Sequence, residues 1–427
     1  MIRFFTLFLL MLAVVTGAKG AVTLDYCLQR AEENYPEIRN YGLIDNLTEL
    51  NLSEINRSWL PKATVYAQGN VQNIVPAFPD ALRNVLASTG YEMKGMGKFQ
   101  YKIAADVNQT IWDGGASKSS RKVERADAEA SRAALDVELY GIRRQVESVY
   151  FGILLMEDQI AQTLSTISLL EANLKRIQSM VKNGTAMQSD ADMVEAQWLT
   201  LRQSLAEART ATEGYRAVLG IYTGEDMSAS ELICPDATLP SSLESARPEL
   251  TLFDKKIGQN LARENAIKSS LMPRVSLFAQ AYYGYPGYNY FEGMTNRNLS
   301  FNIMAGVKIA WNIESLYTKD LSRKKLQTGS AMIETDRDLF LYNIRLQTAR
   351  DEAAILGIRE VMKEDARIVE LRKNIRISAE SQLANGVIDA TTLLSKINDE
   401  NQARLNSAYH KIQLVQNIYQ LKNTLNR

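Results

Sequence analysis

Apolar residues recur at alternating spacings of three and four along two long stretches of the chain. In the first stretch, only Thr163 interrupts the series between positions 146 and 181. The members of this series are Val146, Val149, Ile153, Met156, Ile160, Ile167, Leu170, Leu174, Ile177 and Val181. Such a series places one apolar stripe along a helix, as in a coiled coil. We therefore expect a helix from about 117 to 182, which at about 1.5 Å per residue is roughly 100 Å long and exceeds what a single globular core requires.

A return helix is expected after this long helix. Asn183-Gly184 ends the long helix, because asparagine and glycine tolerate the left-handed conformation found at helix ends. The return helix then runs from about 189 to 219, and a shorter helix at about 36–58 opens this half of the chain.

The second half of the chain repeats this plan. It opens with a short helix at about 248–270 and continues with a long helix at about 318–383. The break is Asn385-Gly386, and a return helix follows at about 390–425.

Between the short and the long helix of each half, apolar and polar residues alternate. A period of two is typical of a strand with one apolar face. The expected strands are Lys62–Val71, Phe99–Trp112, Arg274–Tyr285 and Leu299–Asn312. Each strand has about ten to fourteen residues, and a tilted strand that crosses a membrane needs about nine to eleven.

The sequence also repeats itself directly. WLPKATVYAQG (59–69) is followed 212 positions later by LMPRVSLFAQA (271–281), and NYPEI (34–38) by ARPEL (246–250) at the same interval. Matched landmarks in the same order indicate an internal duplication. The predicted first repeat spans 21–219, with a hairpin at 62–112 and a tip near 183–190. An inter-repeat linker follows at 220–247. The second repeat spans 248–427, with a hairpin at 274–312 and a tip near 385–392.

The first twenty residues have the features of a signal peptide. Arg3 is followed by an apolar run at 4–15, and Ala18-Lys19-Gly20 offers small residues at a cleavage site. The apolar run is too short to span a bilayer. We therefore expect an exported protein whose signal peptide is residues 1–20.

Composition and charge argue against several functional classes. The 49 basic and 49 acidic side chains balance, so a nucleic-acid-binding surface is not expected. His410 is the single histidine, and His and Cys do not have the spacing of a metal site. The sequence also has no Gly-rich phosphate loop and no nucleophile elbow. We therefore expect no catalytic residues, no metal and no cofactor, although an exported enzyme is retained as a disfavoured hypothesis.

Aromatic residues and prolines mark the ends of the expected strands. Aromatic girdles at both interfaces are typical of outer-membrane barrels. The residues assigned to barrel entry and girdle are Trp59, Pro61, Trp112, Pro273, Tyr283 and Trp311. Four strands cannot close a membrane barrel, because the smallest known barrels have about eight. Three copies would supply twelve strands in a closed cyclic trimer, so we expect a homotrimer.

Each half has the same order of elements: a short helix, a Leu-Pro or Met-Pro corner, a hairpin ending near Trp112 or Trp311, a long helix, an Asn-Gly tip and a return helix. This duplicated order resembles the TolC family of outer-membrane efflux proteins. The resemblance covers nearly the whole mature chain. It implies a mainly α protein with a small β part, in which duplicated antiparallel helices form a trimeric α-barrel topped by a twelve-stranded transmembrane β-barrel.

The same resemblance implies a function. Members of the family are passive ducts in the outer membrane of Gram-negative bacteria and extend into the periplasm. They serve tripartite efflux or secretion systems as partners of a periplasmic adaptor protein and an inner-membrane pump. The family transports drugs, metals and proteins, so the resemblance does not identify the cargo.

In that family the two helix tips form the periplasmic entrance and face the adaptor. A typical tip has Gly, then Asp six residues later, then apolar residues. Asn183, Gly184, Asp190 and Met193 fit this pattern. The second tip, with Asn385, Gly386, Thr392 and Leu393, departs from it because threonine replaces the aspartate. Asp190 has a second interpretation as an ordinary helix-start residue.

Two alternatives remain open at this stage. A periplasmic coiled-coil scaffold without a transmembrane pore would explain the long helices but would leave the alternating strands without a role. Cys27 and Cys234 lie in the N-terminal segment and in the linker, which the resembling fold brings together outside its helical barrel. They either form a disulfide, as an oxidising compartment permits, or act as separate packing residues.

Overall fold

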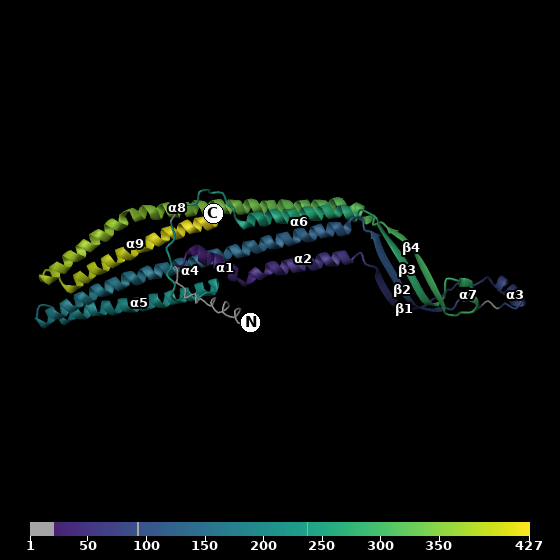
Figure 1. Ribbon diagram of the computed structural model, residues 1–427, viewed down its shortest axis with the longest axis horizontal. Coiled ribbons are helices and arrows are strands. Elements are labelled where there is room, and N and C mark those ends of the chain that lie inside the picture. Colours follow the sequence, from purple (N-terminus) through teal and green to yellow (C-terminus); the bar gives the residue numbers. More distant parts are fainter. Residues whose placement is uncertain (1–20, 92–93, 237) are drawn as a thin grey trace, which may run out of the picture. The chain divides into compact units, whose positions relative to one another are not determined.

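The computed structural model describes residues 21–91, 94–236 and 238–427. The chain divides into two compact units, and each takes segments from both halves of the sequence (Figure 1). The first, here called the helical unit, comprises the described residues up to 41 together with 133–252 and 336–427. The second, here called the strand unit, comprises 42–132 and 253–335.

The helical unit is built from long helices. Its elements are α1 (Leu24–Asn34), the 3-10 turn η1 (Pro36–Arg39), the later part of α4 (Ala116–Lys182), α5 (Gln188–Thr223), the later part of α8 (Glu314–Ala384) and α9 (Ala390–Leu425). The apolar series predicted from the sequence lies in its core, where Val146 and Ile153 are fully buried and Leu170 is likewise inaccessible. The interpretation of this series as a helix-packing seam is therefore confirmed.

The strand unit contains one antiparallel sheet in the order β1-β2-β3-β4. Its elements are most of α2 (Asn40–Arg57), β1 (Lys62–Val71), α3 (Asp80–Ser88), β2 (Phe99–Trp112), the start of α4, α6 (Pro248–Ser270), β3 (Arg274–Tyr285), α7 (Tyr290–Thr295), β4 (Ser300–Ala310) and the start of α8. The two hairpins pair with each other through β2 and β3, so both halves of the sequence contribute to one sheet.

The predicted elements agree closely with those observed. The bounds of β1, β2 and β3 are as expected, and α9 also begins and ends where predicted. The fourth strand is shorter and α8 begins earlier, because the Asn312 side chain accepts a hydrogen bond from the Glu314 N–H at 3.2 Å and starts the helix. The sequence analysis did not place α1, α3 or α7.

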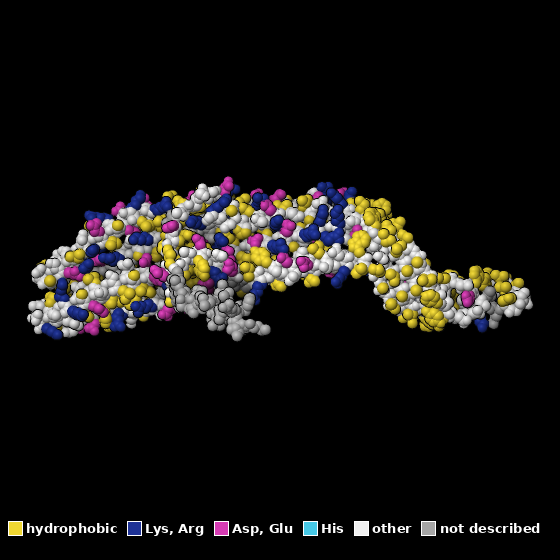
Figure 2. All heavy atoms as spheres, in the orientation of Figure 1, with side chains coloured by type: hydrophobic (Ala, Val, Ile, Leu, Met, Phe, Trp, Pro, Cys, Tyr) yellow, Lys and Arg dark blue, Asp and Glu magenta, His cyan; other side chains and the backbone are white. Residues whose placement is uncertain are grey.

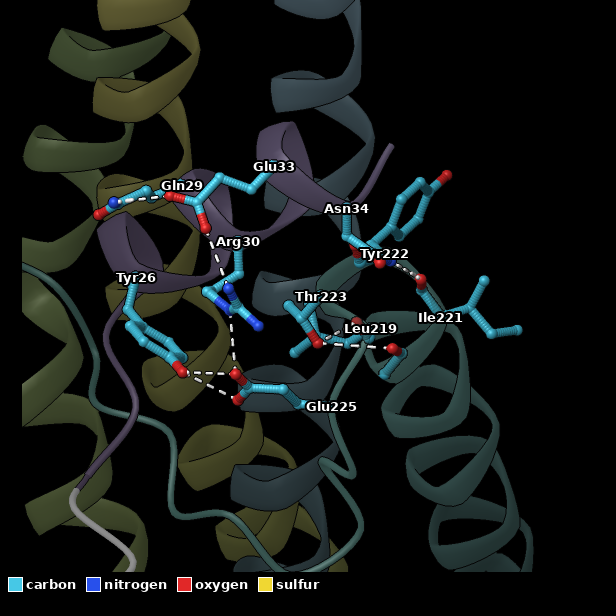
Figure 3. Close-up of polar contacts among 11 residues, drawn as sticks. Tyr26, Gln29, Arg30, Glu33, Asn34, Leu219, Ile221, Tyr222, Thr223 and Glu225 are labelled. Atoms are coloured by element: carbon cyan, nitrogen blue, oxygen red, sulfur yellow. Dashed lines mark hydrogen bonds and ion pairs between the residues drawn. The ribbon is translucent and has the colours of Figure 1, made fainter. Parts of the chain in front are cut away.

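The N-terminal helix α1 is fastened to the end of α5 by polar contacts (Figure 3). The Tyr26 hydroxyl donates to both carboxylate oxygens of Glu225 at 2.8 and 2.9 Å. Arg30 Nε donates to Glu225 at 2.9 Å, and Asn34 Nδ2 donates to the Ile221 carbonyl at 3.1 Å. Together these bonds hold the first helix against the end of α5 and the residues that directly follow it.

The start of the described chain also meets the inter-repeat linker. Val22 forms a parallel bridge with Leu232, and its N–H donates to the Glu231 carbonyl at 2.8 Å. The Tyr150 hydroxyl of α4 lies 2.8 Å from the Val22 carbonyl and 2.7 Å from the Ile233 carbonyl. A single buried tyrosine therefore bonds to both segments.

The two cysteines are not bridged. Cys27 is buried inside α1, a helix that the sequence did not predict, whereas Cys234 is exposed, and both thiols are free. Cys27 packs in a core cluster with Leu24, Phe151 and Leu219. Of the two alternatives, the structure thus supports separate residues, with Cys27 acting as a small core hydrophobe.

Candidate functional site: a two-faced sheet and two helix tips

One face of the sheet is almost wholly apolar. Successive side chains of a strand point to opposite faces, so the observed register assigns most strand residues to one face or the other. The face here called the apolar face carries Ala63, Val65, Ala67, Gly69, Val71, Phe99, Tyr101, Ile103, Ala105, Val107, Gln109, Val275, Leu277, Ala279, Ala281, Tyr283, Phe301, Ile303, Ala305, Val307 and Ile309. Gln109 is the one polar amide among these described residues, and none of them is charged.

The apolar face is open to solvent in the single chain. Val65 is 74% exposed, Ile303 is 68% exposed and Ile309 is 71% exposed. Figure 2 shows hydrophobic side chains covering most of the strand region in view. A continuous exposed patch of this kind marks a protein or membrane contact.

The opposite face, here called the polar face, has a different chemistry. It carries Lys62, Thr64, Tyr66, Gln68, Asn70, Gln100, Lys102, Ala104, Asp106, Asn108, Thr110, Arg274, Ser276, Phe278, Gln280, Tyr282, Gly284, Asn302, Met304, Gly306, Lys308 and Ala310. Its side chains bond across strands: Gln280 Nε2 donates to Asp106 at 2.6 Å and lies 3.3 Å from the Tyr66 hydroxyl. Exposed apolar residues on one side and bonded polar residues on the other are typical of a strand between lipid and water.

Aromatic residues lie near both ends of the apolar face. Trp112 and Trp311 are exposed at the end next to the long helices, and Trp311 Nε1 donates to the Leu271 carbonyl at 3.0 Å. Tyr283 is exposed near the other end, where Phe301 faces it across the strand pair. These positions fit two interfacial girdles around an apolar band.

The remaining predicted corner residues lie where the strands begin. Pro61 and Pro273 directly precede β1 and β3. Proline suits the start of a strand because it cannot donate to the ladder. Trp59 is half-buried and lines a cleft with Lys62 and Arg274. Trp59 therefore lies beside the polar side of the corner and not in the exposed aromatic band.

The two helix tips have the same backbone geometry. At the first tip Gly184 has a φ of 73°, and its N–H donates to the Val181 carbonyl at 3.0 Å, while the Thr185 N–H donates to the Met180 carbonyl at 2.9 Å. At the second tip Gly386 has a φ of 71° with the matching bond to Leu383 at 3.0 Å. This pair of bonds is the Schellman motif, whose left-handed residue favours glycine. The tips are thus a structural repeat as well as a sequence repeat.

Each return helix is started by a carboxylate, but from a different position. Asp190 lies in the first turn of α5, and its Oδ2 accepts from the Met187 N–H at 3.0 Å. Asp389 precedes α9, and its Oδ1 accepts from the Thr392 N–H at 2.8 Å. Hydrogen bonds from the Thr392 side chain and N–H lower the pKa of Asp389 below its usual value. The second tip therefore does carry a carboxylate, which the fixed Gly-to-Asp spacing failed to locate.

The predicted tip residues differ in accessibility. Asn183, Gly184, Asn385, Gly386 and Thr392 are exposed, Met193 is 37% exposed, and Asp190 is half-buried. Leu393 is 1% exposed and packs with Ala191, Val194 and Leu383 in a cluster that joins the four long helices of the helical unit. Leu393 therefore supports the tip from within and offers little surface to a partner.

A buried ionic network links the long helices behind the tips. Arg376 of α8 donates to Glu400 of α9 at 2.7 Å and to Glu380 at 2.9 Å, and Arg404 also bonds to Glu400. Asn173 of α4 donates to Glu380 at 3.2 Å. Burial raises the pKa of the Glu400 carboxyl, but the hydrogen bonds and charges of the two arginines outweigh it and lower the pKa below the usual value. The pairs Arg376–Glu380 and Glu400–Arg404 are local i,i+4 pairs, whereas the bond between Arg376 and Glu400 joins two helices and has no local signal in the sequence.

Solved structures with a similar fold are known. VceC, an outer membrane protein of Vibrio cholerae, has a TM-score of 0.66 at 10% sequence identity, over 94% of this chain and 95% of that one. The CmeC outer membrane channel of Campylobacter jejuni has a TM-score of 0.65 at 13% identity, over 94% and 85%. The MtrE outer membrane channel of Neisseria gonorrhoeae has a TM-score of 0.62 at 15% identity, over 94% and 88%.

The chain has the fold of these outer-membrane channels. The resemblance predicted from the sequence is thereby confirmed at the level of the fold. No family model and no curated protein sequence matches the chain. The similarity is thus one of fold, at 10–15% sequence identity.

The single histidine of the chain lies between two long helices of the helical unit. His410 Nδ1 lies 2.9 Å from an Asp365 carboxylate oxygen between α9 and α8, in a packing position. Within the described ranges, His, Cys, Asp and Glu form no group that could hold a metal ion. Of the helices that the structure describes, none is long and apolar enough to cross a bilayer.

Glu147 is a buried carboxyl in the helical unit. It is 8% exposed, and the Asn423 amide of α9 donates to it. Burial raises the pKa of Glu147 to about 8, while Arg143, Arg144 and Lys422 act to lower it and Asp25 acts to raise it. The side chain therefore remains largely protonated at neutral pH.

The stability of the protein is expected to depend on Glu147 above about pH 4.5. Because the folded-state pKa is about 8 and the ordinary value is 4.5, the stabilising contribution is complete below 4.5 and is lost as the pH rises through 8. Glu147→Gln cannot ionise, so it should reduce this loss of stability with rising pH. The midpoint of thermal unfolding, measured from about pH 5 to about pH 9, tests this. Glu138→Gln, an exposed change on the same helix, is the control and should leave the decline intact. Identical pH profiles for wild type and Glu147→Gln would contradict the assignment.

Proposed function

We propose that this protein is the outer-membrane channel of a tripartite efflux or secretion system. It resides in the outer membrane of a Gram-negative bacterium and extends into the periplasm. Three copies form a passive duct, in which twelve strands close a barrel and the long helices continue the passage toward an inner-membrane pump. Cargo moves through the duct, and the energy is supplied elsewhere.

The two-faced sheet carries this proposal. Its apolar face holds no charge among the described residues, and its strands of ten to fourteen residues have the length of membrane strands. In a periplasmic scaffold this face would stay in contact with water, at a cost of about 25 cal/mol per Å² of apolar surface left exposed. A membrane removes that cost, so the channel accounts for the sheet and the scaffold does not.

The sheet also supports a trimer. β1 and β4 each pair on one side within the chain, which leaves one edge of each strand open. Unpaired backbone groups are not tolerated in lipid. Joining β4 of one copy to β1 of the next satisfies both edges, and three copies give a barrel wide enough for a lumen.

The helix tips are the proposed contact for a periplasmic adaptor protein. They present exposed groups on short rigid turns, including Met187 at 73% and Val387 at 70% exposure. Apolar side chains displayed singly on capped turns suit insertion into a partner groove. We assign the adaptor contact to Asn183, Gly184, Asp190 and Met193 and to Asn385, Gly386 and Thr392, with Leu393 as internal support.

The trimer is the direct test of the architecture. Native mass measurement of the protein extracted in detergent is expected to give three chains, because four strands per chain cannot close alone. Membrane fractions washed with alkaline carbonate should retain the protein, since a barrel is released only by detergent. A stable folded monomer, or complete release by the wash, would contradict the proposal.

A further inference from the structure

The charged side chains of the sheet are unevenly distributed. All of them lie on the polar face: Lys62, Lys102, Arg274 and Lys308 are basic, and Asp106 is the one carboxylate among the described strand residues. Each chain therefore has an excess of three positive charges on this face. The whole chain has no such imbalance, since its 49 basic and 49 acidic side chains cancel.

Three of the basic side chains lie together at the end of the sheet next to the long helices. Lys62 pairs with Asn108, Lys308 faces Ser276, and Arg274 begins β3. The register places them in three successive rows of the polar face, within about 14 Å along the strands. All three are exposed. Figure 2 shows further Lys and Arg side chains gathered beside this end of the sheet.

A cleft of about 270 Å³ opens at this end of the polar face. Its lining includes Lys62, Arg274, Thr110 and Asp113. The Asp113 carboxylate is engaged by the start of α4, where it accepts from the Gly115 N–H at 2.8 Å and the Ser117 N–H at 2.6 Å. The two basic side chains are thus left to face the open space.

The basic side chains lack carboxylate partners. Across the described ranges, neither Lys62, Arg274 nor Lys308 forms an ion pair. The Lys102 ammonium lies over aromatic rings, 5.7 Å from the centre of Tyr66 and 5.3 Å from that of Tyr282. The Asp106 carboxylate is bonded to Gln280. The positive charge of this face is therefore not neutralised within the chain.

We infer that the strand-lined part of the duct selects anions over cations. This inference rests on the proposed function, because it takes the polar face as the lumen. Three chains would bring nine basic groups into one zone at the base of the barrel. Rings of Lys and Arg favour anions in pores, and low-dielectric walls strengthen their field.

Ion selectivity of the purified trimer tests this inference. In a planar bilayer with a KCl gradient, the zero-current potential is expected to show chloride favoured over potassium by about five- to tenfold. The preference should weaken as salt is raised, because the Debye length falls from about 10 Å at 0.1 M to about 3 Å at 1 M. The triple variant Lys62→Gln, Arg274→Gln and Lys308→Gln should lose the preference while still conducting.

A second variant provides a shift of opposite sign. Asp106→Asn removes the carboxylate but keeps an acceptor for Gln280, so it should increase the preference for chloride. A conducting wild-type pore that prefers potassium, or an unchanged ratio in Asp106→Asn and in the triple variant, would overturn the inference and leave the channel proposal standing. Assembled trimers that never conduct at either voltage sign would overturn the proposed function, and the inference with it.

Discussion

Replacing Ile303 with arginine is expected to prevent stable insertion into the outer membrane. Ile303 lies on the apolar face in the middle of the sheet, in one row with Val65, Ala105 and Ala281. An arginine on the lipid face near the midplane costs about 2–4 kcal/mol, so three chains would together lose roughly 6–12 kcal/mol. The measurement is the amount of heat-resistant trimer in the outer-membrane fraction.

The adjacent residue provides a matched control. Met304 is also a large exposed hydrophobic residue, but it lies on the polar face because strand neighbours point to opposite sides. Met304→Arg should therefore insert and assemble as the wild type does. If both arginine variants insert equally well, the assignment of the two faces is wrong.

Proline at the two tip glycines is expected to abolish export without removing the protein from the membrane. Proline holds φ near −65°, whereas Gly184 and Gly386 have φ values of 73° and 71°. It also removes the N–H groups that bond to Val181 and Leu383 at 3.0 Å. The restricted φ and the lost N–H both affect the turn itself, because a Cβ added at either glycine would meet no atom within 4 Å.

The test compares export activity with the amount of trimer in the same cells. Gly141→Ala and Gly357→Ala are the controls, because these glycines lie inside α4 and α8 with room for a methyl group and without a positive φ. They should leave export unchanged. Normal export in both proline variants would argue against the tips as the docking surface, and Asp190→Ala should have a smaller effect confined to docking or opening.

Much of the fold could be predicted because its elements are long and strongly periodic. The seam through Val146 and Ile153 predicted α4, and strict alternation along Tyr101, Ile103 and Val107 predicted β2. Glycine after asparagine predicted both helix ends because left-handed φ values are a local backbone requirement. The short helices α3 and α7 were missed, since they occupy segments between strands where neither period is sustained.

The candidate site was predicted less completely. Leu393 was assigned to the tip surface by its position after the break, but packing against α4 and α5 buries it. Asp389 was missed because the tip motif places its carboxylate at a fixed distance from glycine, whereas a helix start accepts a capping carboxylate at more than one position. Glu400 and Glu147 look like ordinary helix-surface acids in the sequence, and only their distant partners Arg376 and Asn423 reveal that they are buried.

The sequence by itself determined where the helices and strands lie, where the helices turn, and which strand residues share a face, because these follow from the 3.6- and two-residue periods and from the conformational freedom of glycine. The tertiary structure decided that β2 pairs with β3, so that the two repeats form one sheet with matched apolar and polar faces. It also decided which acids are buried and which of the two cysteines is in the core. The pairing of β2 with β3 and the contact between Glu147 and Asn423 join segments more than 150 residues apart, and local patterns do not encode such partners.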